Sequence, residues 1–143
     1  MLNKAIEIAA RAHKDQEDKG GSPYILHPLR VMLRCQSDLE ITCAVLHDVV
    51  EDSDITFDDL KNEGFTEEVI AVLHCLTKRE GESYDDFIGR VLENETACRV
   101  KLADLADNMD ITRIQDPTEE DRARIEKYRR ASKRINEAIP SSH

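Results

Sequence analysis

The sequence predicts an all-α fold, and three observations carry that prediction. Apolar residues recur at spacings of three and four along most of the chain, which is the pattern of amphipathic helices. Aromatic residues make up only 4% of the chain and Trp is absent, which suits aliphatic helix packing better than a β-sandwich. Residues that cap helix N-termini precede several apolar runs. At 143 residues the chain has the length of one domain, so we expect a single bundle over 1–143 with about seven or eight helices.

The first part of the chain predicts three helices. One apolar stripe defines the first helix. A polar loop, 16–23, follows it, with two glycines and a proline in QEDKGGSP. Pro28 suits the first turn of the second helix. The three helices are expected over 2–15, about 27–35 and about 39–52.

The second part predicts five more helices, several of them marked by cap residues. Asp59 stands three residues after Thr56 in a capping box, and Gly64 ends that helix. Another helix carries its buried stripe on Val69 and Leu76. The expected starts are Thr56, Thr66 and Ser83, and the two longest helices are expected over 97–114 and about 118–138.

Composition narrows the function classes. The net charge of -10 repels polyanions, which argues against nonspecific binding of DNA or RNA. A small phosphate substrate remains compatible, because a metal ion and a few local cations outweigh the global field. No apolar run has membrane-spanning length, and the N-terminus lacks a signal-peptide core. The cysteines lie apart without a CxxC pair and indicate thiols of a reducing compartment: Cys35, Cys43, Cys75 and Cys98. We therefore expect a cytoplasmic protein, whose oligomeric state the sequence leaves open.

The run AVLHDVVED concentrates polar chemistry directly after an apolar stretch. On a helix, a spacing of four would place His47 over Glu51 and Asp48 over Asp52. Buried charges are usually paired or bound to a metal. The run therefore suggests a divalent cation site.

Two other segments offer further metal ligands. His27 stands at a predicted helix start, in LHPL, and Asp104 follows apolar residues in VKLADLADNMD. Asn108 lies four residues after Asp104, on the same helix face. Together with His47 and Asp48, these residues form a nitrogen and oxygen ligand set without thiolate. Such a set favours Mn, Fe or a catalytic Zn with open positions.

Each of these residues also has a structural interpretation. The His47-Asp48 pair alone could be an ion pair at a helix end, and 51–54 could be a solvated acidic terminus. Asn108 could serve as a capping or packing amide. His13, on the apolar stripe of the first helix, is more often a satisfied buried histidine than a ligand.

The charged final helix is expected to expose one face to solvent. Tyr128 and Lys127 on this helix could nevertheless reach the mouth of a site.

Three motifs in order, PYILHP, VLHDVVED and VKLADLADN, resemble the HD superfamily of metal-dependent phosphohydrolases. More narrowly, they are similar to the hydrolase domain of RelA/SpoT-type enzymes and to small stand-alone alarmone hydrolases. The resemblance spans about 2–115 and implies an HD-type helical fold. It implies one metal ion, usually Mn²⁺, held by His27, His47, Asp48 and Asp104.

The resemblance also implies a reaction. Glu51 and Asp52 would position or activate the attacking water, and Asn108 would lie beside a bound nucleotide. The expected activity removes the 3′-pyrophosphate from ppGpp or pppGpp, yielding GDP from ppGpp. Residue chemistry adds three expected polyphosphate contacts: Lys19, Lys101 and Arg113.

Three positions depart from the family pattern. Asp18 stands where these hydrolases commonly carry an arginine before PYxxHP, and a carboxylate cannot stack on a purine as a guanidinium does. Leu105 stands where Arg or Lys is frequent, and Asp107 where His is common. The expected alternatives are a hydrolase of another nucleotide or phosphate ester, and a noncatalytic nucleotide-binding HD module.

Overall fold

Nine α-helices and one short 3-10 helix build residues 1–140, the part of the chain that the computed structural model describes. The only β pairing within these residues is an isolated bridge between Glu17 and Pro23 in the first loop. The all-α prediction is therefore confirmed. The elements are α1 (Leu2–Ala12), α2 (Leu26–Leu33), α3 (Asp38–Leu46), α4 (Val49–Asp52), α5 (Phe57–Asn62), α6 (Glu67–Leu76), α7 (Tyr84–Val91), α8 (Glu95–Asn108), η1 (Ile111–Arg113) and α9 (Glu119–Ala138).

Side-chain caps begin four of these helices where the sequence predicted them, at Thr56, Thr66, Ser83 and Thr118. The Thr56 side chain accepts a hydrogen bond from the Asp59 backbone N–H, and the Asp59 carboxylate accepts one from the Thr56 backbone N–H, which completes a capping box. The same arrangement joins Thr118 and Asp121 at the start of α9. Single caps occur at Ser37, Thr66, Ser83 and Asn94.

The prediction of one continuous helix over 39–52 is wrong. The chain turns at His47 and Asp48, between α3 and α4, and Asp48 has φ -104° and ψ -1°. The His47 Nδ1–H group donates to the Ala44 carbonyl at 2.6 Å, so the side chain folds back on the last turn of α3. The four-residue spacing therefore does not stack His47 on Glu51. Instead, the corner turns the imidazole and the Asp48 carboxylate into the protein.

The helix expected over 97–114 also has different bounds. It begins two residues earlier, after the cap Asn94, and it ends at Asn108. The short helix η1 follows, with Asp110 as its N-cap accepting from the Thr112 backbone N–H at 3.1 Å. This break separates Arg113 from α8 and lets it fold back toward Asp107.

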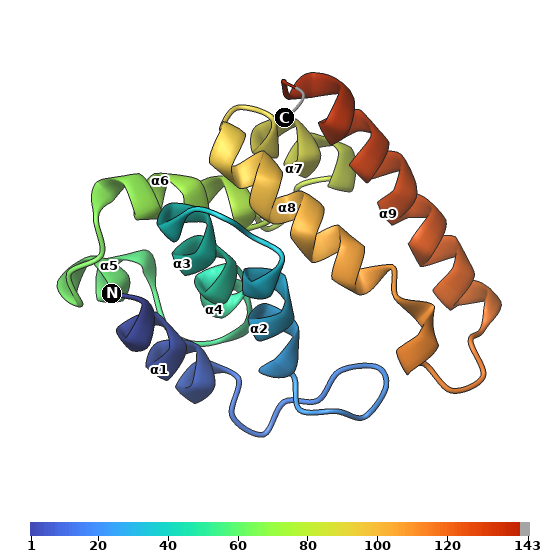
Figure 1. Ribbon diagram of the computed structural model, residues 1–143, viewed down its shortest axis with the longest axis horizontal. Helices are drawn as coiled ribbons and strands as arrows, with labels where there is room; N and C mark the ends of the chain where they lie inside the picture. Colours follow the sequence, from blue (N-terminus) through green and yellow to red (C-terminus); the bar gives the residue numbers. More distant parts are fainter. Residues whose placement is uncertain (141–143) are drawn as a thin grey trace.

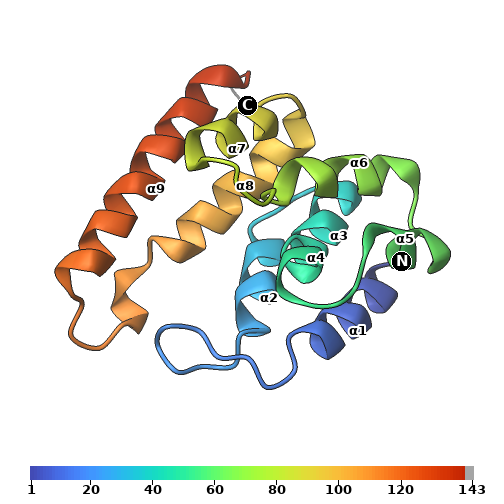
Figure 2. The ribbon, with the colours of Figure 1, turned by 180° about the vertical axis from the view of Figure 1, so that it is seen from behind.

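Helix α3 occupies the centre and packs against α1, α2, α6 and α8 (Figure 1). Helix α9 runs along α8 on the outside, and the view from behind shows the same pairing (Figure 2). One hydrophobic core joins these helices. Its largest side chains with almost no exposure include Leu46, Leu60, Leu73, Ile88, Leu105 and Ile135.

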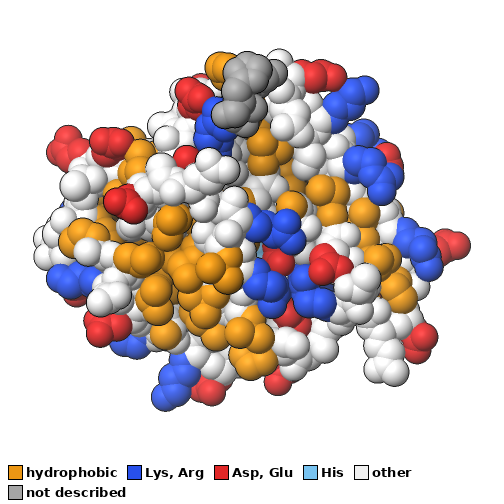
Figure 3. All heavy atoms as spheres, viewed as in Figure 1, with side chains coloured by type: hydrophobic (Ala, Val, Ile, Leu, Met, Phe, Trp, Pro, Cys, Tyr) orange, Lys and Arg blue, Asp and Glu red, His pale blue; other side chains and the backbone are white. Residues whose placement is uncertain are grey.

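The surface hides the histidines of the sequence motifs. His27 is 4% exposed and His47 is 3% exposed. Figure 3 accordingly shows apolar and charged side chains on this face but almost no histidine. No helix within residues 1–140 is both long and apolar enough to cross a membrane.

Replacing Ile135 by Ala tests how α9 is attached. Ile135 is 0% exposed, so we expect the free energy of unfolding to fall by about 2–5 kcal/mol, from lost burial and a residual cavity. Urea denaturation measures this. The control is Arg129→Ala on the same helix, whose side chain is 67% exposed; it should change stability by less than about 0.5 kcal/mol. Similar effects of the two substitutions would contradict the packing of α9 on the core.

Candidate metal centre and adjoining pocket

Three parts of the fold bring the four predicted ligands together. His27 comes from α2, His47 and Asp48 from the corner between α3 and α4, and Asp104 from α8. The Nε2 atoms of His27 and His47 lie 2.9 Å and 3.2 Å from Asp104 Oδ1. Asp48 Oδ2 lies 3.0 Å from His47 Nε2 and 3.7 Å from His27 Nε2. Residues far apart in the sequence thus form one compact cluster.

Both imidazoles are oriented by hydrogen bonds on their far sides. His27 donates its Nδ1–H to Asp107 Oδ2 at 2.6 Å, and His47 donates its Nδ1–H to the Ala44 carbonyl at 2.6 Å. Both Nε2 atoms therefore face the carboxylates of Asp48 and Asp104. Outer-shell acceptors of this kind set the tautomer of metal-binding histidines and increase their basicity.

The electrostatics of the cluster favour positive charge at its centre. Burial alone would lower the pKa of His27, but hydrogen bonds to Asp104 and Asp107 raise it above the usual value. Burial is likewise outweighed at His47, where Asp48 and Asp104 raise the pKa well above the usual value. Burial would raise the pKa of Asp104, yet Lys101 and His47 hold it well below its ordinary range.

This donor set fits a divalent cation. With both Nδ1–H groups already donated, each Nε2 atom faces a carboxylate oxygen, and only a proton or a cation makes that contact favourable. Ligand atoms of His27, His47 and Asp104 all lie within 4.8 Å of one another. Nitrogen and oxygen donors without thiolate suit Mn, Fe or a catalytic Zn. The three residues are thus a candidate metal site, with Asp48 beside them.

Asp107 is the main site residue that the sequence analysis missed. It was noted only as a departure from the family pattern. Its carboxylate is 0% exposed, receives the His27 bond, and accepts from Arg30 Nε at 2.8 Å. Burial would raise its pKa, but His27 and Arg30 hold it below the usual range. Its position three residues after Asp104 on the same helix was the available signal.

Glu51 and Asp52 lie on α4, directly after the corner that carries two of the predicted ligands, His47 and Asp48. Glu51 Oε1 accepts the Lys78 backbone N–H at 3.0 Å. Asp52 is exposed as a residue. Its carboxyl group is nevertheless partly shielded from water by the surrounding protein. This shielding and the negative charges of Asp48 and Glu51 raise the pKa of Asp52 to about 6. Burial and Asp48 also raise the pKa of Glu51.

A hollow of about 310 Å³ adjoins the cluster, between the first loop, the end of α8, η1 and α9. Two hydrogen bonds join it to the cluster. Tyr24 donates to Asp48 Oδ2 at 2.5 Å, and Asn108 Nδ2 donates to Asp104 Oδ1 at 3.0 Å. The lining includes three of the four predicted substrate contacts, and adds two residues of α9: Lys19, Asn108, Arg113, Arg124 and Tyr128.

Lys101, the fourth predicted contact, is not part of this lining. Its Nζ donates to Asp104 Oδ2 at 2.8 Å and lies 5.0 Å from the centre of the Phe87 ring. Its direct partner is thus a cluster carboxylate, and its contact with a polyphosphate stays a prediction. Lys127 lies over the Tyr84 ring, at 4.3 Å from the ring centre.

Asp18 organises the first loop. Its Oδ1 accepts the backbone N–H groups of Gly20 and Ser22, both at 2.9 Å. Gly20 itself packs closely against η1. A Cβ at this position would lie only 2.5 Å from the Arg113 carbonyl oxygen, so a larger residue would not fit without a shift. The carboxylate at this position therefore holds the loop that walls the pocket.

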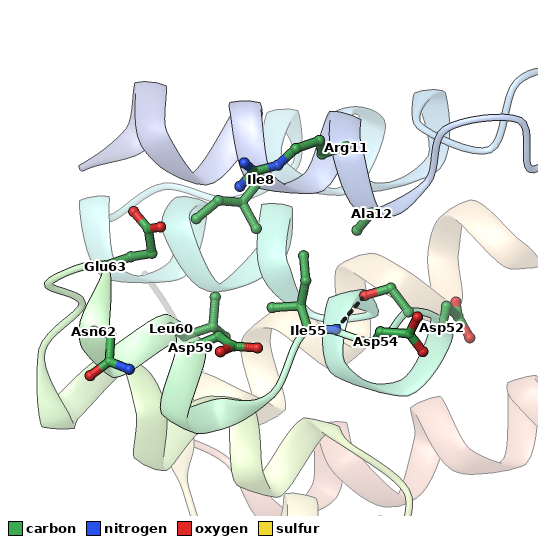
Figure 4. Close-up of a pocket in the computed structure, with 11 residues that line it drawn as sticks. Ile8, Arg11, Ala12, Asp52, Asp54, Ile55, Asp59, Leu60, Asn62 and Glu63 are labelled. Atoms are coloured by element: carbon green, nitrogen blue, oxygen red, sulfur yellow. Dashed lines mark hydrogen bonds between the residues drawn. The ribbon is translucent and has the colours of Figure 1, made fainter.

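A larger hollow of about 670 Å³ lies elsewhere, between α1, α5 and the segment that follows α4. Figure 4 shows Ile8 and Ile55 pointing toward each other across it, with Asp52 and Asp54 near Ala12 at one end. None of the four predicted ligands lines it. Size alone therefore does not identify the reaction site, and only Asp52 connects this hollow with the predicted site residues.

Replacing Asp107 by Asn tests the support of His27. Removing the charge weakens the basicity of the imidazole, so we expect about 10- to 100-fold weaker Mn²⁺ binding. Calorimetric titration of the metal-free protein with Mn²⁺ measures this affinity. Asp110→Asn is the matched control, because it removes the same charge from a partly exposed side chain that pairs with Arg113. Equal affinities for the Asp107→Asn variant and the unchanged protein would refute the role.

The chain is similar to known proteins in sequence and in fold. No protein-family model matches the chain. A curated relative from Aquifex aeolicus, named guanosine-3′,5′-bis(diphosphate) 3′-pyrophosphohydrolase, is 35% identical over 120 residues, which cover 76% of this chain and 17% of that protein. A relative of the same name from Borreliella burgdorferi is 39% identical over 79 residues, which cover 52% of this chain and 12% of that protein. The chain thus spans less than a fifth of the length of either relative.

A solved structure has a similar fold. It belongs to a metazoan ortholog of SpoT that is described as hydrolysing ppGpp. The two structures superpose with a TM-score of 0.77 and share 23% sequence identity, over 94% of this chain and 84% of the other. Sequence similarity and fold lead to one conclusion: this chain is homologous to the ppGpp hydrolase domains of SpoT/Rel proteins.

Proposed function

We propose that this chain is a metal-dependent phosphohydrolase that removes the 3′-pyrophosphate from ppGpp or pppGpp. One observation carries the proposal. His27, His47, Asp48 and Asp104 converge beside a pocket that carries cationic side chains, in a chain homologous to curated 3′-pyrophosphohydrolases. We propose that it acts in the reducing environment of the cytoplasm, where its four free thiols would persist.

The proposed metal ion is Mn²⁺, held by the two imidazoles and the two carboxylates. When bound, such an ion would withdraw charge from phosphate oxygens and lower the pKa of a nearby water. His27 and His47 have their Nε2 lone pairs directed at this place by Asp107 and the Ala44 carbonyl.

Glu51 and Asp52 are the proposed acid and base groups. The water oxygen attacks the phosphorus that is bonded to the ribose 3′-oxygen, and that P–O bond breaks. One carboxylate takes the proton from water, and the departing 3′-oxygen takes a proton to become a hydroxyl. A pKa of about 6 leaves Asp52 mostly ionised at neutral pH, yet basic enough to accept a proton.

The adjoining pocket would hold the nucleotide. Lys19, Arg113 and Arg124 supply positive charge for phosphate oxygens within a protein of net charge -10. The Tyr128 ring offers a flat surface for a base. Asn108 reaches Asp104 and lines the pocket at once, so it would link nucleotide binding to the metal site.

Asp18 favours a second candidate within the same enzyme class, a hydrolase of another nucleotide or phosphate ester. Asp18 lines the pocket, and its carboxylate offers a base no cationic stacking surface. The noncatalytic alternative requires no acid and base pair, and Glu51 and Asp52 on α4 argue against it.

Glu51→Gln separates catalysis from binding. The amide oxygen can still accept the Lys78 N–H, but it cannot take a proton. We expect kcat for ppGpp hydrolysis to fall by about 10²- to 10⁴-fold while Mn²⁺ affinity changes little. Ion-exchange chromatography of GDP and pyrophosphate measures the rate, and a chelator should abolish it in the unchanged protein. The control Asp54→Asn removes a nearby charge and should retain full activity. An unchanged rate in Glu51→Gln would remove Glu51 from the mechanism.

Substitutions of Asp18 test whether the carboxylate limits guanine recognition or supports the loop. Asp18→Asn keeps an acceptor for Gly20 and Ser22, so we expect near-normal kinetics. Asp18→Arg loses both bonds, and we expect kcat/KM for ppGpp to fall by about tenfold, equivalent to about 1.4 kcal/mol. Faster ppGpp turnover by the Asp18→Arg variant would show that base contact, rather than loop structure, is limiting.

A further inference from the structure

A polar pair at the end of α1, the buried His13 and the partly buried Gln16, takes no part in the site described so far. His13 is 2% exposed, and its Nδ1 lies 3.0 Å from Gln16 Oε1. Gln16 Nε2 donates to two carbonyl groups, those of Ala12 at 3.1 Å and Asp52 at 3.0 Å. One amide thus joins the end of α1 to the end of α4, across 36 residues of sequence.

The directions of these hydrogen bonds are determined by chemistry. Because both carbonyl groups accept, the Gln16 nitrogen must face them, and its oxygen is left to accept from His13 Nδ1–H. Burial lowers the pKa of His13, which favours the neutral imidazole with a bare lone pair on Nε2. That atom is buried and has no hydrogen-bond partner within residues 1–140. An orphaned buried acceptor costs folding free energy, so the pair is not explained by stability alone.

Asp52 has few other attachments. Within the described residues, its carboxylate makes no hydrogen bond or ion pair, and it borders the open hollow seen in Figure 4. Helix α4 has only four residues, too short to hold its own shape. Besides the bond from the Asp52 N–H to the Asp48 carbonyl, the Gln16 contact is what holds the Asp52 backbone.

We propose that Gln16, oriented by His13, is a positioning residue that holds Asp52 in place for hydrolysis. This inference rests on the proposed function. An amide is the side chain that meets the requirement, since it provides two donors for the carbonyls and one acceptor for the imidazole. Gln16→Glu cannot donate to either carbonyl, and Gln16→Leu makes none of the three bonds.

The experiment is a double-mutant cycle with ppGpp and Mn²⁺. We expect Gln16→Leu and Gln16→Glu to lower kcat at least tenfold, with KM and Mn²⁺ affinity within twofold of the unchanged protein. In the Asp52→Asn background, Gln16→Leu should have no further effect on kcat, because the group it positions is gone. Assays run well below the unfolding midpoint of each variant. The control is Lys14→Ala, an exposed position in the adjoining turn, which should retain full activity.

Two results would overturn the inference: an unchanged kcat in Gln16→Leu, or an equal further loss in the Asp52→Asn background. If the unchanged protein does not hydrolyse ppGpp, the proposed function fails by itself. Amide hydrogen exchange then tests the attachment directly. Faster exchange over 49–55 in Gln16→Leu would support positioning of this segment by Gln16, and unchanged exchange would overturn it.

Discussion

The need to neutralise one buried carboxylate organises this protein. Asp104 is 4% exposed, and an unpaired charge at that depth would cost several kcal/mol. Groups from α2, from the corner after α3 and from α8 itself all point at it. These groups are His27, His47, Lys101 and Asn108. The hydrogen bonds to Asp104 therefore both join α2, α3 and α8 and set the geometry of the candidate metal centre.

A second buried carboxylate extends the arrangement outward. Asp107 lies one turn along α8 from Asp104 and is fully buried. Its carboxylate accepts from His27 Nδ1–H, while Arg30 and Arg113 compensate its charge from two other elements. The imidazole thus lies between two carboxylates, one on each nitrogen. This explains how His27 can be rigid and directed at the cluster although α2 begins only one residue before it.

The first loop shows how a departure from a family pattern changes meaning in three dimensions. Read along the chain, Asp18 is a missing cation. In the fold, its carboxylate closes the turn through the backbone of Gly20 and Ser22. Gly20 then packs against the Arg113 carbonyl, so the loop and η1 form one wall. Positive charge reaches the pocket from α9 as well, through Arg124, beyond the segment that resembles the family core.

The sequence by itself determined the helical class, most helix starts and the chemical types of the candidate ligands. Those features depend on local rules: apolar periodicity, cap residues such as Thr56 and Thr118, and dipeptides such as His47-Asp48. Tertiary structure decided the turn at 47–48, the burial of Asp107 against His27, and the contact of Gln16 with Asp52. Each of these depends on atoms brought together from distant parts of the chain; His27 and Asp107 are 80 residues apart. Local propensity favours a continuous helix through residue 47, whereas satisfying buried charges requires the chain to turn there.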